Sequence, residues 1–348
     1  MNKVTTLLSM MSSSSPNRRQ QSHGMIVVVA GLLLCTAVKT SAAEFPQFQL
    51  PQKEDGSVDF LVVGDWGRGG DFNQSKVAEQ MGIVGDQMGI QFVISTGDNF
   101  YEDGLTGTCD PNFTNSFTNI YTAPSLNKPW YNVLGNHDYR GDAEAQLSPI
   151  LKAKDGRWNC FRSAILSAGP VDFIFVDTTP FVDTYFKNPG EHRYDWTGVL
   201  PRETYLSDML KELDWTLKAS SGPWKIVVGH HPIKTAGEHG VTEELVQRML
   251  PILKINNVDF YINGHDHCLQ RIASIDSKLE FLTSGGGSKA WRGIIRPLDK
   301  PQEMKFYYDG QGFLAVRMHH YKASFHFYDV YGNNLHNWDV QKIPFINT

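Results

Sequence analysis

Long apolar runs, basic patches and thiolate motifs are all missing from this 348-residue sequence. The longest apolar run covers only residues 25–38, which is short of the roughly 20 residues that a membrane-spanning helix needs. A net charge of −5, without any stretch rich in Lys and Arg, disfavours nucleic acid as a partner. The cysteines form no thiolate motif, so a Cys-type zinc finger and an iron–sulfur centre are excluded.

The N-terminal segment differs from the rest of the chain. Arg18 and Arg19 precede the apolar run, and the small residues 40–43 follow it. This order predicts a secretory signal over residues 1–43, so the chain is expected to be secreted, either to the extracellular space or to the vacuole. A signal anchor is the alternative, because the segment before the apolar run is unusually long. After removal of the signal we expect no stable membrane insertion.

Export would also permit disulfides and glycans. Cys109 and Cys160 lie in loop-like sequence and could pair, whereas Cys268 is the better candidate for a free thiol. Sequence alone does not fix this connectivity. The sequons at Asn73 and Asn112 predict N-glycans on both residues.

Short apolar runs alternate with helix-like segments along the chain. Runs of four to six residues rich in Val, Ile and Phe predict buried strands at 58–63, 91–96, 130–134, 171–176, 224–228 and 258–262. Helical spacing of apolar residues predicts helices over 73–87, 202–218 and 241–254. From residue 313 the pattern changes to the alternation of antiparallel strands. We therefore predict an α/β fold in which two sheets form a sandwich flanked by helices, in one domain from about 55 to 345.

The predicted strands share a second property, because five of the six end in a turn that carries good metal ligands. The carboxyl ends of strands meet at one edge of an α/β sheet, so residues far apart in sequence can converge there. Each residue alone has an ordinary reading as a turn or core residue. Together they favour a metal site, and seven donors suit two ions that share a bridging carboxylate. The converging residues are Asp65, Asp98, Tyr101, Asn136, His137, His230, His265 and His267.

The set GDWG, GDNFY, GNHD, VVGH and GHDH resembles the metallophosphoesterase superfamily, and specifically the purple acid phosphatases. Tyr101 stands at the position that separates this family from its relatives. Glu238-His239-Gly240 after VVGHHP resembles the small form, similar to tartrate-resistant acid phosphatase. GTC at 107–109 and RWNC at 157–160 resemble the low-molecular-weight plant members. The resemblance implies a four-layer α/β/β/α sandwich of two mixed sheets and a single catalytic domain over residues 44–348.

The resemblance also implies a binuclear centre of Fe(III) and a divalent ion, which could be Fe, Zn or Mn. Its first site would be hard and anionic, and its second site would suit a divalent ion. The implied ligands are Asp65, Tyr101 and His267 for the first ion, Asn136, His230 and His265 for the second, and Asp98 as the bridge. A ferric phenolate at Tyr101 would give a purple colour.

By the same resemblance, the protein is a secreted acid phosphatase that hydrolyses small phosphate monoesters and releases inorganic phosphate. A metal-bound hydroxide would attack phosphorus, His137 would meet the charge on the phosphate oxygens, and His239 would protonate the leaving group with Glu238 beside it. The alternatives are a phosphodiesterase of the same superfamily, an added peroxidase-type redox activity, and a phosphate-binding protein without catalysis.

Two further segments have less certain roles. His231 directly follows His230, and only one of the two can point at the site, so we interpret His231 as a structural or supporting residue. Residues 187–202 form a long aromatic and charged loop that either lines the pocket or is a plain surface connection.

Overall fold

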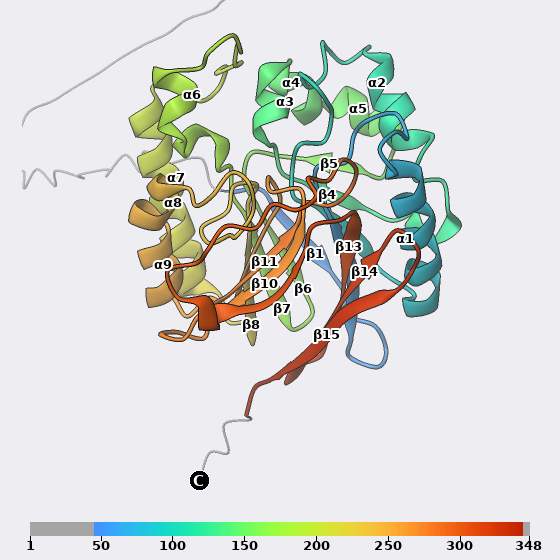
Figure 1. Ribbon diagram of the computed structural model, residues 1–348, viewed down its shortest axis with the longest axis vertical. Coiled ribbons are helices and arrows are strands. Elements are labelled where there is room, and N and C mark those ends of the chain that lie inside the picture. The colour runs from blue at the N-terminus through green and yellow to red at the C-terminus, as the bar shows by residue number, and fades with distance from the viewer. Residues whose placement is uncertain (1–44, 344–348) are drawn as a thin grey trace, which may run out of the picture. The chain divides into compact units, whose positions relative to one another are not determined.

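Two mixed β-sheets pack face to face in the computed structural model, which describes residues 45–343 (Figure 1). The eight strands of the first sheet are, in spatial order, β1 (Gln47–Leu50), β6 (Ala164–Ala168), β7 (Val171–Phe175), β8 (Trp224–Val228), β9 (Phe260–Asn263), β11 (Glu280–Ser284), β10 (Leu269–Ala273) and β12 (Met304–Tyr308). The seven strands of the second are β15 (Asn334–Gln341), β14 (Lys322–Asp329), β13 (Gly312–Met318), β2 (Val58–Val63), β3 (Phe92–Ser95), β4 (Trp130–Asn132) and β5 (Trp158–Cys160). The predicted signal over residues 1–43 lies outside the described residues.

Strand β2 shows how one sequence run builds two layers of the core. All six of its residues are buried, as expected for a strand covered on both faces. Phe60 and Val62 face the other sheet, while Leu61 and Val63 face outward. The outward face packs beneath helix α1 (Gln74–Met88), whose apolar side chains recur at helical spacing.

The first sheet is covered on its outer face by three helices: α7 (Arg202–Ala219), α8 (Glu243–Arg248) and α9 (Leu250–Ile255). Leu206 and Leu213 of α7 pack against Val227 and Tyr261 of the sheet. Figure 1 shows these helices on one side and α1 on the other, with both sheets between them. The predicted four-layer α/β/β/α sandwich is therefore confirmed.

Short helices occupy the connections above the strand ends. They are α2 (Pro111–Phe113), α3 (Asn136–Arg140), α4 (Ala143–Leu147), α5 (Pro149–Lys154) and α6 (Asp183–Lys187), with single turns η1 (Thr114–Thr118), η2 (Pro124–Leu126), η3 (Thr179–Phe181) and η4 (Pro301–Glu303). The helix predicted over 241–254 is instead two helices, α8 and α9. Pro251 cannot donate an N–H to the preceding turn, so the helix restarts after Met249.

The tentative pairing of Cys109 with Cys160 is wrong in this structure, where Cys109, Cys160 and Cys268 are all free. Cys160 belongs to strand β5 and packs against apolar clusters on both sides, while Cys109 lies exposed in a loop. The expectation that Cys268 is a free thiol is confirmed, and the structure shows that its side chain is buried. Among residues 45–343, no helix is long and apolar enough to cross a membrane.

The loop between α5 and β5 is held by a buried carboxylate, which gives a prediction about stability. Asp155 Oδ2 lies 2.6 Å from Arg157 Nη2 and accepts a hydrogen bond of 2.9 Å from Thr118 Oγ1. Burial pushes the pKa of Asp155 upward, but the hydrogen bonds and charge of Arg157 outweigh burial and lower it. A lowered pKa stabilises the folded state above the unfolded value of about 3.9, and this stability is lost as pH falls through the folded pKa.

We therefore expect Asp155→Asn to cost about 1–3 kcal/mol in the free energy of unfolding at pH 6. The difference in Tm between wild type and variant should shrink as pH is lowered below about 3.9. The control is Asp86→Asn, which changes an exposed residue of α1. A deficit that stays constant down to pH 3 would contradict the assignment.

Candidate metal centre

Five strand ends from both sheets place polar side chains at one edge of the sandwich. Asp65 follows β2, Asp98 follows β3, and Asn136 begins α3 just after β4. His230 and His265 follow β8 and β9 of the other sheet. These five side chains are all buried, as are Tyr101 and His267. The structure thus brings all seven predicted ligand residues together, at the place where the carboxyl ends of parallel strands meet.

Three of these residues have a left-handed backbone conformation, which is unfavourable for a residue that carries a side chain. Asp65, Asp98 and His265 have φ values of 61°, 50° and 68°. Such a left-handed conformation costs roughly 1–2 kcal/mol per residue and recurs at functional sites. It turns each side chain back toward the strand ends. The surrounding hydrogen bonds maintain it: the carboxylate of Asp65, for example, accepts the backbone N–H of His265 at 3.0 Å.

The phenol oxygen of Tyr101 faces two carboxylate oxygens and an imidazole nitrogen at once. It lies 3.2 Å from Asp65 Oδ1, 3.1 Å from Asp98 Oδ2 and 3.1 Å from His267 Nε2. One hydroxyl proton can satisfy only one of these partners. Burial, and then the charges of Asp65 and Asp98, raise the pKa of Tyr101 well above its usual value. A cation among these atoms would relieve the repulsion, so the donor set fits a metal ion.

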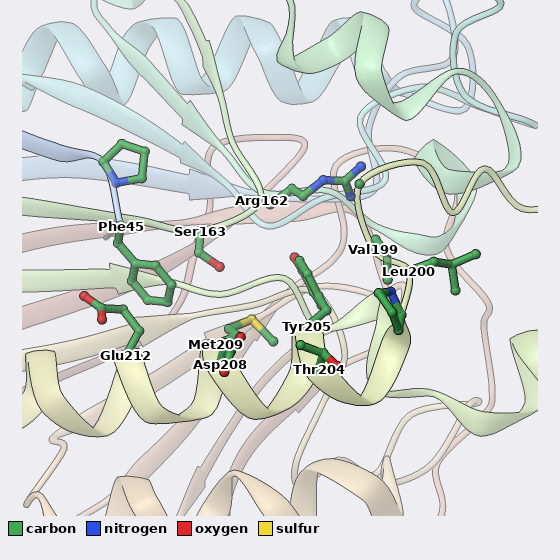
Figure 2. A pocket seen from close by; sticks show the side chains of 13 residues that line it. Phe45, Arg162, Ser163, Val199, Leu200, Thr204, Tyr205, Asp208, Met209 and Glu212 are labelled. Atoms are coloured by element: carbon green, nitrogen blue, oxygen red, sulfur yellow. The ribbon is translucent and has the colours of Figure 1, made fainter. Parts of the chain in front are cut away.

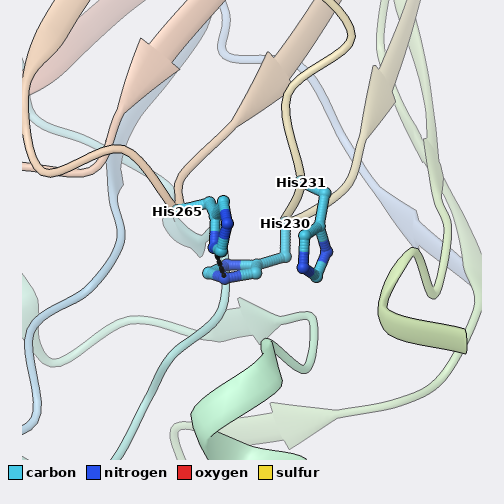
Figure 3. A group of neighbouring side chains, drawn as sticks. All are labelled: His230, His231 and His265. Atoms are coloured by element: carbon cyan, nitrogen blue, oxygen red, sulfur yellow. Dashed lines mark hydrogen bonds between the residues drawn. The ribbon is translucent and has the colours of Figure 1, made fainter. Parts of the chain in front are cut away.

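A second cluster surrounds the ring of His230. Its Nδ1 lies 2.9 Å from the carbonyl oxygen of Thr96, which assigns the proton to Nδ1 and leaves a lone pair on Nε2. That Nε2 lies 3.1 Å from Asn136 Oδ1, 3.2 Å from His265 Nδ1 and 3.5 Å from Asp98 Oδ2. Figure 3 shows the rings of His230 and His265 meeting at these nitrogens. Lone pairs converge here, so this cluster also fits a cation.

The electrostatics of the chain agree with this geometry. Burial lowers the pKa of His230, but the neighbouring carboxylate of Asp98 outweighs burial and raises it to about 9. Burial raises the pKa of Asp98, yet His230 and then His137 bring it well below its usual range. The site therefore carries a field that favours positive charge, which a proton on His230 or a metal ion can supply.

His231 lies beside His230 and His265, and its ligand atoms come within 4.8 Å of theirs (Figure 3). Both of its ring nitrogens already have partners. Nδ1 lies 3.1 Å from Thr178 Oγ1, and Nε2 lies 3.0 Å from the hydroxyl of Tyr185. Since neither nitrogen is left for a metal, the geometry agrees with a supporting role for His231.

The three predicted catalytic residues lie at different distances from the clusters. His137 is nearest: its backbone N–H donates to Asp98 Oδ1 at 2.8 Å, and its ring centre lies 4.4 Å from that of Tyr101. The exposed His239 stacks on His265 with ring centres 4.1 Å apart. The carboxylate of Glu238 makes no hydrogen bond or ion pair with the described residues, so no contact joins it to the site.

Two buried carboxylates that sequence reasoning did not assign hold the turns in place. Asp138 accepts hydrogen bonds from the backbone N–H groups of Asn99 and Gly135, at 3.0 and 2.8 Å. Asp266 accepts the backbone N–H of His239 at 2.8 Å and a hydrogen bond from the Thr235 hydroxyl. Both residues lie inside the motifs GNHD and GHDH, which was the available signal.

Two further residues cover the site, and the sequence carried no signal for them. The half-buried indole of Trp291 stacks on His267 with ring centres 4.0 Å apart and an interplanar angle of 6°. It also meets the ring of His239 edge-on at 5.0 Å. The guanidinium of Arg68 lies 3.6 Å above the ring of Tyr101. Both residues belong to segments without regular periodicity.

The loop at 187–202 reaches the boundary of the site. Tyr194 stacks on Tyr185 with ring centres 4.9 Å apart, and the hydroxyl of Tyr185 contacts His231. The guanidinium of Arg140 lies 5.9 Å from the ring of Tyr194. The aromatic part of this loop thus meets the site through Tyr185, whose hydroxyl contacts His231, while Tyr185 and Arg140 are themselves not predicted ligands.

Comparison with known proteins agrees with this geometry. The family model of the calcineurin-like phosphoesterases matches residues 58–269. Purple acid phosphatase 3 of Arabidopsis thaliana is 60% identical over 307 residues, covering 88% of this chain and 84% of the relative. Tartrate-resistant acid phosphatase type 5 of Sus scrofa is 31% identical over 249 residues, covering 66% and 69%. The solved structure of GAP50, the anchor in the inner membrane complex of Plasmodium, shares the fold with a TM-score of 0.68 at 23% identity, covering 82% and 89%.

The sandwich and its clustered donors define a metallophosphoesterase of the calcineurin-like class. Within that class, the chain belongs to the purple acid phosphatases. It is an acid phosphatase with a dimetal centre, and phosphate monoesters are its substrates and phosphate its product. The family, the fold and the enzyme class expected from the sequence are confirmed.

Gly135, a glycine beside the centre, provides a test in which no ligand residue is itself substituted. A Cβ at Gly135 would lie 2.2 Å from Asp98 Oδ1 and 2.4 Å from Asp98 N. Gly135→Ala must therefore displace the Asp98 carboxylate. We expect the variant to bind less metal and to lose roughly ten- to a hundredfold in phosphatase activity, as when a group that orients a ligand is removed.

The metal bound per chain is measured by inductively coupled plasma mass spectrometry, alongside kcat/KM. Gly156→Ala is the matched control, because a Cβ there meets no atom within 4 Å. Full metal content and activity in Gly135→Ala would show that the position of Asp98 does not matter to the centre.

Proposed function

We propose that the protein is a secreted purple acid phosphatase that hydrolyses phosphate monoesters at an Fe(III)–M(II) centre, where M is Fe, Zn or Mn. The observation that carries the proposal is the phenol oxygen of Tyr101, which lies within 3.2 Å of two carboxylate oxygens and an imidazole nitrogen. In this reading Asp65, Tyr101 and His267 hold the ferric ion. Asn136, His230 and His265 hold the divalent ion, and Asp98 bridges the two.

The donor chemistry supports this assignment of metals. The first set combines two carboxylates, one of them shared, with a phenolate, and hard anionic oxygens suit a trivalent ion. The second set combines two imidazoles with an amide oxygen and the shared carboxylate, which suits a divalent ion. When bound, the two ions supply Lewis-acid activation of the attacking water and of the phosphate.

The chain's own residues would orient the substrate and move protons. His137 lies over Tyr101, with its Nε2 3.9 Å from Asp98 Oδ2, so it can donate a hydrogen bond to a phosphate oxygen at the same edge. Trp291 covers His267 by stacking on its ring and meets the ring of His239 edge-on, while His239 stays exposed to solvent.

His239 is the proposed general acid for the leaving alkoxide. Its ring is open to solvent on one side and stacked on His265 on the other, so it can exchange protons with water while staying beside the centre. Asp266 accepts the backbone N–H of His239, which fixes the main chain from which the His239 side chain starts. Glu238 would act through the charge of its carboxylate on His239, since it makes no direct contact.

The route of the protein to its destination is part of the proposal. We infer that residues 1–43 are a secretory signal, that residues 44–348 form the single catalytic domain, and that Asn73 and Asn112 carry N-glycans. Asn73 precedes α1 and makes no capping bond with its side chain. The side chain of Asn112 donates to the carbonyl of Tyr101 at 3.3 Å and accepts from Ser116. Asn73 is therefore the acceptor that a glycan disturbs less.

The role of Tyr101 is tested by visible absorption. A ferric phenolate absorbs visible light, so we expect the purified enzyme to show a broad band that Tyr101→Phe loses. Tyr121→Phe is the matched control, because Tyr121 is fully buried in an aromatic cluster with Trp66 and Phe117 and is not a proposed ligand. An active, metal-loaded wild type without the band would mean that the first ion is not ferric or that Tyr101 does not bind it.

The role of His239 is tested with leaving groups of different basicity. A general acid contributes roughly 10²–10⁴-fold when the leaving group needs its proton. We expect His239→Gln to lose activity by about that factor on alkyl phosphates and much less on 4-nitrophenyl phosphate. His320→Gln, at an exposed position far along the chain, should leave both rates unchanged. An equal loss on both substrates would indicate that His239 acts in binding rather than as an acid.

A further inference from the structure

A cavity of about 380 Å³ opens beside helix α7, apart from the metal centre. Helix α7 forms one wall, residues 198–201 form another, and the start of the described chain at Phe45 closes the end (Figure 2). None of the proposed metal ligands or catalytic residues lines it. Its volume lies within the range of roughly 300–1,000 Å³ that is typical of small-molecule sites.

Most of the cavity wall is apolar. Phe45 and Met209 belong to the core cluster between α7 and the first sheet, so their positions are fixed by packing. Val199 and Leu200 face them from the other wall, as Figure 2 shows. Any side chain at Gly198 would contact Glu144 at 3.1 Å and Arg162 at 3.4 Å, so glycine keeps this end of the wall free. A ligand here would bury an apolar body.

Two charged groups of the cavity wall are acidic, Asp208 and Glu212, and one is basic, Arg162. The carboxylate of Asp208 is already paired with Lys211 at 3.0 Å, whereas no ion pair holds Glu212 among the described residues. Asp208 and Glu212 lie four residues apart on α7 and therefore share one face of the helix. The Oε1 atom of Glu212 is buried and has no hydrogen-bond partner among the described residues. Figure 2 shows this carboxylate beside the ring of Phe45. A buried carboxylate oxygen without a donor marks the place where a ligand's N–H group would bind.

Arg162, the cation in the cavity wall, already pairs with carboxylates of the protein. Arg162 Nη2 donates to Glu144 Oε1 at 2.8 Å, and its Nη1 lies 3.6 Å from Asp177 Oδ2. One guanidinium thus faces two carboxylates behind the wall, and since Lys211 offsets the charge of Asp208, Glu212 supplies the remaining negative charge in front. An anionic ligand would meet repulsion here, whereas a cation would be attracted.

We propose that this cavity binds a small amphipathic amine, with its ammonium group on Glu212 and its apolar body between Phe45, Met209 and Leu200. Such a ligand supplies the donor that Glu212 lacks and matches the sign of the lining charge. The site is independent of the phosphate chemistry at the metal centre.

The cavity also touches a hydrogen-bond network that runs to helix α3. Tyr205 lines the cavity, and its hydroxyl donates to Asp177 Oδ2 at 2.8 Å. The same carboxylate oxygen accepts a hydrogen bond from Tyr139. Tyr139 belongs to α3, the helix that begins with Asn136. A ligand in the cavity would therefore lie three side chains from a proposed metal ligand.

The test is a calorimetric titration of the metal-loaded enzyme with 2-phenylethylamine and, separately, with 2-phenylethanol. The two probes share the apolar body and differ in the ammonium group. We expect saturable binding of the amine, about tenfold tighter than that of the alcohol, because a hydrogen bond to a buried charged group discriminates by about that factor or more. Equal affinities, or no saturable binding of the amine, would overturn the proposal.

Substitutions in the cavity wall show where the amine binds. Glu212→Gln should abolish the preference for the amine, while Glu203→Gln should keep it, because Glu203 lies on the same helix but pairs with Arg248 outside the cavity. Asp208→Asn should weaken the preference in part, and it serves if Glu212→Gln does not fold. A preference that survives Glu212→Gln places the amine elsewhere.

A competition experiment tests whether the amine binds at the metal centre instead. Saturating inorganic phosphate, which fills the metal centre, should leave amine binding unchanged, and loss of amine binding would show that the amine binds at the centre.

Discussion

The structure depends on a crowding of oxygen and nitrogen lone pairs at the edge shared by the two sheets. The phenol oxygen of Tyr101 lies within about one hydrogen-bond length of a carboxylate oxygen of Asp65 and of Asp98. Arg68 lies against the face of the Tyr101 ring and not among these oxygens, while a proton on His230 would place positive charge 3.5 Å from Asp98 Oδ2. Burial of these oxygens without positive charge nearby is costly, so the fold is built around a site that a proton or a metal ion completes.

The need to hold these buried oxygens together explains local features that are unfavourable by themselves. Three residues at the edge take left-handed conformations, and Gly135 is fixed by close approach, because any larger residue there would collide with Asp98. Asp138 and Asp266 repay part of the cost by accepting backbone N–H groups from the turns. Beneath them, Trp66 and its aromatic neighbours form a packed base. The turns and the packing beneath them thus set the positions of the ligand residues before any ion binds.

The parts predicted from the sequence are those encoded locally. A strand buried on both faces reads as an apolar run, and a donor directly after it marks the edge, which is why Asp98 and Tyr101 could be assigned. Trp291 and Arg68 could not, because their contacts join segments distant in sequence and neither lies in a periodic stretch. Strands β10 to β12 were missed for a related reason: their apolar residues are interrupted by charged ones such as Arg271, which pairs with Glu280 across the ladder.

The buried carboxylates of the site divide into two kinds, and their partners explain the division. Asp138 is surrounded by backbone N–H groups and the amide of Gln146, and burial raises its pKa to about 7. Asp98 has histidines as partners, and against the effect of burial the charges of His230 and then His137 lower its pKa. Every group around Asp138 is a donor, so this carboxylate works as an acceptor that holds the turns, and a proton on it would remove one of these hydrogen bonds. Asp98 faces rings that can carry positive charge, which keeps it ionised and available to a cation, so the partners of each carboxylate match its role in the site.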